Sequence, residues 1–451
     1  MLSVAILVSF VSFALRLAKA FFVVPEAERR STRPVLSAIC FLAASAPCSA
    51  WAEAPPTLPD ARLSLTLAQA ISRADARAPD VVMAHHAVRE AEARRVGAGV
   101  VFPANPRLSV DARPPVTGGA VIADIGYGAT LDLPFEVGGA PAARVREADR
   151  WAGVARAELG VERLRSRDIA WTAYLRAKVA EQRIVELELS LAIAERVLAA
   201  SRQRADAGAS ADIEQSLASA EVAQLQLAIQ QSARAQRTHV MELKDALDMP
   251  ALEPVALVTR VEEPPPAPSD QILVSRALEM RPELAVIKQR IMLLDATGDR
   301  LRKELFPRMG MYVGVDAAPQ SPIFGMVGLS IELPVAQRNQ GPRARVEAAR
   351  AGEVTREDLT ARRIVRDVLA ARDAYEARRI ELRVLTESAL PSVLRTLELV
   401  EIGWRAGRFD VFRVTTAARD VARVRGQRLD ALEAAWMERI AIDRAVGGMG
   451  T

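Results

Sequence analysis

Apolar residues occupy every second position in two parts of the chain, residues 125–133 and 327–333. A period of two places successive side chains on opposite faces of a β-strand. Weaker alternation precedes each stretch, so we predict strand pairs over 107–134 and 307–334. Tilted strands of about 9–11 residues can cross a bilayer when one face is apolar and the other polar. The candidate lipid-facing residues are Leu131, Leu133, Leu329 and Ile331.

A helical period follows each strand pair. Apolar residues recur at spacings of three and four, as in Ile184, Leu187, Leu191, Ala194 and Leu198, which is typical of a coiled-coil seam. We therefore predict two long helical hairpins, over 139–248 and 342–446. The first helix alone, from Arg144 to Ala205, spans roughly 93 Å at ~1.5 Å per residue.

The order of these patterns occurs twice. Phe102-Pro103 returns as Phe306-Pro307, and Leu-Asp-Leu-Pro at 131–134 returns as Ile-Glu-Leu-Pro at 331–334. The separation stays near 200 residues, which predicts an internal tandem repeat. The two copies cover 53–249 and 269–451. A Pro-rich, extended linker at 250–268 joins them.

The N-terminus carries the features of a signal peptide. Three arginines precede an apolar run at 35–46, and Ala-Trp-Ala follows at 50–52. We predict a targeting segment over 1–52 and cleavage after Ala52. Cys40 and Cys48 both lie in this segment, so the mature chain has no disulfide and no thiolate metal site.

Composition narrows the class of protein. The chain is 50% hydrophobic, 26% charged and only 4% aromatic, which excludes a disordered chain and is typical of long helices. Beyond the targeting segment no apolar run reaches the ~18 residues of a membrane-spanning helix. The net charge of +4 arises mostly at the N-terminus, which argues against a nucleic-acid partner.

No motif indicates catalysis or a resident cofactor. The chain lacks a Gly-rich phosphate loop, an H-E-x-x-H element and a G-x-S-x-G element. His85 and His86 are adjacent and point to different helix faces, and His239 is the only other histidine. We predict no enzyme activity, no cofactor and no metal site.

Four strands per chain cannot form a closed sheet alone. In a bilayer an open edge leaves unpaired N–H and C=O groups, each costing several kcal/mol. Three chains supply twelve strands, an even number within the known range. The fold predicted is mainly α with a transmembrane β part. A homotrimer forms a 12-stranded β-barrel, four strands per chain, which a periplasmic coiled-coil barrel of α-helices continues.

Three motifs resemble one family. They are Leu-Pro-Phe-Glu-Val-Gly-Gly at 133–139, Leu-Pro-Val-Ala-Gln-Arg-Asn-Gln-Gly at 333–341 and Trp-Arg-Ala-Gly at 404–407. The chain resembles the outer-membrane efflux proteins, the TolC-like channels of tripartite pumps, and within them the CzcC-type cation-efflux branch. The resemblance implies a passive outer-membrane conduit in contact with lipid. Its partners are then a periplasmic adaptor (membrane fusion) protein and an inner-membrane transporter of the resistance-nodulation-division (RND) type.

The resemblance also implies a periplasmic tip with a gate. Tip and adaptor contacts fall on Gly208, Gly407 and Trp404. Relatives place acidic residues six and nine positions after the turn glycine, where this chain has Arg413 and Thr416. The lumen-gate candidates are Asp410, Arg413, Glu214 and Thr416. For Asp410 a plain helix-capping role is the alternative.

Two other classes of protein fit part of the pattern. A periplasmic adaptor also has a coiled-coil hairpin, but it should carry a single hairpin with flanking barrel and lipoyl-like segments. An elongated structural coiled coil would lack the alternating strands. The duplicated strand pairs favour the conduit over both.

Overall fold

The protein is described by a computed structural model that divides into two units, residues 1–59 and 60–451. The described residues all belong to the second unit. They are 63–448 without 101, 103, 114–124, 207–211 and 319–321. The predicted targeting segment and Gly208 lie outside them.

Two helices, two strands and a long helical hairpin follow one another twice along the chain. The first set comprises β1 (Leu63–Leu65), α2 (Leu67–Arg77), α3 (Pro79–Ala98), β2 (Arg107–Arg113), β3 (Gly126–Glu136), α4 (Ala140–Asp206) and α5 (Asp212–Ala246). The second comprises β4 (Val255–Leu257), α6 (Asp270–Met280), α7 (Pro282–Lys303), β5 (Arg308–Ala317), β6 (Phe324–Glu332), α8 (Gln340–Val384), the π-helical turn η2 (Leu385–Ala389), α9 (Leu390–Arg405) and α10 (Val411–Val446). The expected mainly helical chain with a small β part is confirmed.

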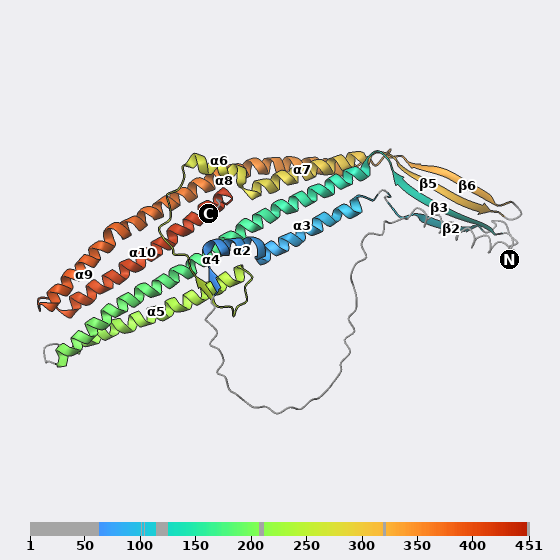
Figure 1. Cartoon of the computed structure of the whole chain (residues 1–451). Helices are drawn as coiled ribbons and strands as arrows, with labels where there is room; N and C mark the ends of the chain where they lie inside the picture. The colour runs from blue at the N-terminus through green and yellow to red at the C-terminus, as the bar shows by residue number, and fades with distance from the viewer. Residues whose placement is uncertain are drawn as a thin grey trace, which may run out of the picture. The chain divides into compact units, whose positions relative to one another are not determined.

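The four long strands form one antiparallel sheet in the order β2-β3-β5-β6. Each strand adjoins one long helix: α3 leads into β2, β3 into α4, α7 into β5 and β6 into α8. The helices pack as neighbours in the matching order, α3 on α4, α4 on α7 and α7 on α8. Sheet and helical layer are therefore two parts of one wall (Figure 1).

Beyond this wall the chain continues as two helical hairpins, α4 with α5 and α9 with α10 (Figure 1). Buried apolar side chains join the halves, because Trp171 and Val179 of α4 share a core with Leu382 of α8 and Leu429 of α10. Near the hairpin ends, a second core combines residues of α4, α5 and α10. Among the described residues, no helix is apolar and long enough to span a membrane.

The segment between the halves departs from a simple linker. Its strand β4 pairs in parallel with β1, and the sequence predicted neither. The Tyr174 hydroxyl donates to Leu65 O and accepts from Thr259 N, both at 3.0 Å. Lys178 Nζ donates to Leu257 O at 2.9 Å. Strands of three residues are too short to show alternation, and hydrogen bonds to α4 hold them in place.

The helix predicted to begin near residue 342 is interrupted once. The π-helical turn η2 lies between α8 and α9, and Pro391 occupies the first turn of α9. Proline has no N–H to donate and its ring clashes with the preceding helical turn. A π-bulge absorbs this mismatch without ending the helix.

Candidate functional site

The sheet has one apolar face. Cross-strand partners share a face of a sheet, and the register sets Leu131 opposite Leu108 and Val313. Two further rows continue the same face toward the helices: Leu133, Met311 and Leu329, then Phe135, Met309 and Ile331. All four residues predicted to face lipid therefore lie on one face. In the single chain Leu329 is 62% exposed and Ile331 54% exposed.

The opposite face is mostly polar or small, with Phe324 and Met326 of β6 as the large apolar exceptions. Its rows set Arg107 by Asp132 and Tyr312, Ser109 by Thr130 and Gly314, and Pro134 by Gly310 and Ser330. At the helix end Glu136, whose side chain is 5% exposed, pairs with Arg144 and lies 3.9 Å from Arg308 Nε. This face can line an aqueous space, and the other can contact hydrocarbon.

Both edges of the sheet are open within the described chain. Strand β2 pairs only with β3, and β6 pairs only with β5. An open edge presents a row of unpaired backbone N–H and C=O groups. The outer edges of β2 and β6 can therefore accept further strands.

The tip of the second hairpin is a tight turn between α9 and α10. Gly407 adopts φ +72°, and its N–H donates to Trp404 O at 2.9 Å. The Asp410 carboxylate accepts from Arg413 N at 3.0 Å and caps α10. The Trp404 ring packs on the core formed by Leu198 and its neighbours.

The remaining gate candidates lie near this turn but do not form one cluster. The Arg413 guanidinium stacks 5.0 Å from the Phe409 ring, and Thr416 Oγ1 donates to Phe412 O at 2.8 Å. Glu214 lies in the first turn of α5 and is half-buried. Among the described residues, no hydrogen bond or ion pair joins Glu214 to Asp410, Arg413 or Thr416.

Replacing Gly407 by valine should destabilise the α9–α10 turn. A β-branched residue at positive φ is strongly disfavoured, at roughly 1–2 kcal/mol for the left-handed region. A Cβ here meets no atom within 4 Å, so strain of the backbone is the only cost. We expect faster proteolysis at the turn and weaker efflux complementation by Gly407→Val.

Gly426→Ala is the matched control for this change. Gly426 also has open space around it but lies within helix α10 at an ordinary φ, so alanine there should be neutral or stabilising. Equal proteolysis and complementation for the two variants would show that the left-handed turn is unimportant.

Sequence patterns missed the ion pair that joins the two hairpins. Arg419 of α10 pairs with Glu221 of α5, and Glu221 is buried. These residues are almost half the chain apart, and neither belongs to a motif. Only their closeness in the sequence to the turn positions could have drawn attention to them.

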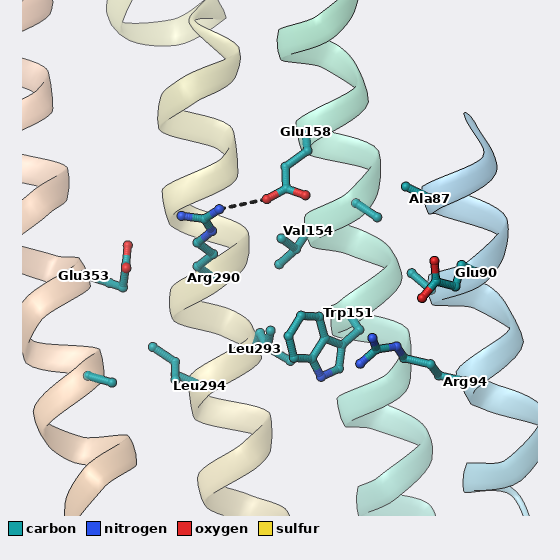
Figure 2. A pocket seen from close by; sticks show the side chains of 13 residues that line it. Ala87, Glu90, Arg94, Trp151, Val154, Glu158, Arg290, Leu293, Leu294 and Glu353 are labelled. Carbon is teal, nitrogen blue, oxygen red and sulfur yellow. Dashed lines mark hydrogen bonds and ion pairs between the residues drawn. The ribbon is translucent and has the colours of Figure 1, made fainter. Parts of the chain in front are cut away.

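A groove of about 560 Å³ crosses the helical layer between α3, α4, α7 and α8. The Arg94 guanidinium stacks 4.6 Å from the Trp151 ring, and Arg290 Nη2 donates to Glu158 at 2.8 Å. Figure 2 shows Trp151 and Arg94 on one side of this groove and Glu353 on the other. No sequence motif indicates this groove, because its residues come from four separate helices.

A buried carboxylate, Asp168 on α4, lies where α4 meets α10. It is 7% exposed, and neither of its oxygens has a hydrogen-bond partner within the described structure. Burial raises its pKa to about 7, and Asp443 and Glu283 add to the rise. Arg444, whose Nε is 3.9 Å away, and Arg281 oppose it.

Nothing in the described residues gathers three His, Cys, Asp or Glu side chains suited to a metal ion. His85 Nε2 lies 3.3 Å from Arg163, and His239 Nδ1 lies 2.9 Å from Glu242. His85 and His239 therefore each contact a charged neighbour.

Comparison with known proteins agrees with this geometry. Residues 273–448 match the family described as outer membrane efflux protein. The resemblance found in the sequence motifs is thereby confirmed.

Individual relatives extend the match over most of the chain. The cobalt-zinc-cadmium resistance protein CzcC of Cupriavidus metallidurans is 24% identical over 322 residues, 71% of this chain and 76% of CzcC. The solved structure of CusC superposes with a TM-score of 0.69 at 17% identity, covering 85% of this chain and 92% of CusC. The outer membrane protein VceC of Vibrio cholerae gives 0.66 at 15% identity, covering 85% and 96%. These structures share the fold of this chain.

Proposed function

We propose that this chain is the outer-membrane channel of a tripartite efflux pump. It acts as a passive trimeric conduit and not as an enzyme. The observation that supports this most is the two-faced sheet, apolar on one side and polar on the other, with both edges open. A transmembrane barrel needs this alternation, and a periplasmic adaptor or a coiled-coil rod does not.

The number of strands needed to close the sheet determines the number of chains in the assembly. Four strands per chain leave the β2 edge of one copy to pair with the β6 edge of the next. Three copies complete a barrel of twelve strands in contact with outer-membrane lipid. The helices are neighbours in the same order as the strands. Closing the barrel therefore also joins the helices of the three chains into a periplasmic tube.

The remaining features fit a pump. A cleaved N-terminal signal exports the chain to the outer membrane of a Gram-negative cell. The tip, with Gly208, Gly407 and Trp404, docks on a periplasmic adaptor protein, which in turn binds an inner-membrane RND-type transporter. Asp410, Arg413, Glu214 and Thr416 lie at the tip constriction. The metal-resistance relative CzcC supports metal cations as cargo, with drugs as the alternative.

The test is single-channel recording on protein purified from outer membranes, together with its mass in detergent. A trimer that produces discrete conductance steps supports the conduit. A trimer that stays silent should conduct once Asp410 or Arg413 at the tip is substituted. A water-soluble monomer that never inserts would overturn the proposal and favour an adaptor or a structural rod.

A further inference from the structure

We propose that three charged residues at the loop end of the sheet, Asp111, Arg113 and Asp316, form a negatively charged ring that favours cations at the outer mouth of the channel. We call them the mouth triad. The inference rests on the proposed conduit, because the ring exists only when three sheets close. It assigns ion preference to the end of the channel opposite the helical tip.

The mouth triad connects two strands, β2 and β5, on the polar face. Arg113 Nε on β2 donates to Asp111 Oδ2 at 2.8 Å, and Arg113 Nη1 donates to Asp316 Oδ2 on β5, also at 2.8 Å. Strand β3 lies between β2 and β5, so the guanidinium reaches across it. The side chains remain accessible, at 57% for Arg113, 48% for Asp111 and 24% for Asp316.

A glycine on the middle strand leaves room for this bridge. Gly128 pairs with Asp111 on one side and Asp316 on the other. A Cβ at Gly128 would lie 2.6 Å from Asp111 Oδ1 and 3.1 Å from Arg113 Nη2. A larger residue at Gly128 would therefore require the Asp111 carboxylate to move.

The triad holds the uncompensated charge of the polar face. Two carboxylates share one guanidinium, which leaves one negative charge per chain at the loop end. The row nearer the helices pairs Arg107 with Asp132. In the last row Arg308 lies between Glu136 and Glu332, and Arg144 of α4 pairs with Glu136. Two positive charges there offset two negative charges. Within the described sheet, the excess of negative charge therefore lies at the mouth.

The described turn between α9 and α10 gives no comparable excess of carboxylates. Asp410 is occupied as a helix cap, and the exposed Arg413 adds positive charge beside it. In three copies the mouth triads place three negative charges around one opening. A ring of one sign raises the local concentration of ions of the opposite sign.

A thiol introduced beside the triad measures this potential without requiring an open channel. Ser109 is exposed, lies on the polar face and is two residues from Asp111 on the same strand. In the Cys40→Ser, Cys48→Ser background, Ser109→Cys is then the only thiol of the chain. Its reaction rates with a cationic and an anionic methanethiosulfonate reagent are measured on purified trimer at low salt.

Opposite changes are expected from two isosteric variants. Asp111→Asn with Asp316→Asn converts one net negative charge per chain to one positive, and should lower the cationic-to-anionic rate ratio about threefold or more. Arg113→Gln should raise the ratio. Both shifts should shrink in 1 M salt, where the screening length falls to about 3 Å.

The control is Arg107→Gln with Asp132→Asn, which removes a charge pair from the same face and leaves the net charge unchanged. Equal ratios in all variants would overturn the mouth triad as a charge ring and leave it a structural bridge. That result would not affect the conduit, whose failure is seen separately as a missing trimer or missing conductance.

Discussion

Arginine in place of Leu131 should lower the yield of trimer in outer membranes at least tenfold. The residue lies in mid-strand on the apolar face, opposite Leu108 and Val313. Arginine at the midplane of a bilayer costs about 2–4 kcal/mol in barrels of this kind. Three copies of the change meet in one assembly, so the cost is multiplied. Trimer is measured by size-exclusion chromatography of detergent-extracted outer membranes.

Thr130→Arg is the matched control, because it places the same side chain one residue away on the polar face. We expect near-normal yield from it. Leu329→Arg, on the neighbouring row of the apolar face, should behave like Leu131→Arg. If both leucine variants assembled normally, the assignment of this face to lipid would be wrong.

Removing the charge of Asp168 should make the protein more stable at pH 8. The pKa of Asp168 is about 7 in the folded protein, whereas the ordinary pKa of an aspartate is 3.8. The folded state thus binds more protons than the unfolded state, so stability falls as pH rises from about 4 to 7 and stays reduced above that. One pKa unit corresponds to about 1.4 kcal/mol, which makes the total about 4 kcal/mol per chain.

Asp168→Asn keeps the shape of the side chain and carries no charge. Melting temperatures at pH 5 and pH 8 should differ less in this variant than in the parent protein, with the gain at pH 8. Asp420→Asn removes an exposed carboxylate that pairs with Arg423 and should leave the difference unchanged. An Asp168→Asn variant that melts lower than the parent at pH 8 would contradict the assigned burial.

Local sequence patterns predicted the long helices and strands. They could not predict the features that depend on contacts between segments far apart in the chain. Alternation around Leu131 and Leu329 marked the strands because burial on one face imposes a period of two. The spacing after Gly407 correctly offered Asp410 as a cap, since capping depends on neighbours in the chain. The register between strands could not be derived, because it depends on which strands pair.

The charged contacts show the same limit. Arg113 reaches Asp316 on another half of the chain, and Arg419 reaches Glu221. Each of these residues taken alone is an ordinary exposed or helical charge. Strands β1 and β4 were missed for a similar reason, since three residues gain their structure from hydrogen bonds to α4 and not from their own pattern.

The shared order of strands and helices sets a geometric condition on the wall. Neighbouring helices are 8–10 Å apart, whereas neighbouring strands are about 4.8 Å apart. If each strand runs into one helix around the same ring, the two circumferences match only when the strands incline by roughly 55–60° to the axis. Gly138 and Gly139, at φ +86° and +81°, lie between β3 and α4, where the chain must change from the inclined to the upright direction. For a given number of strands, the diameter of the pore would then be set by the spacing of the helices and not by the spacing of the strands.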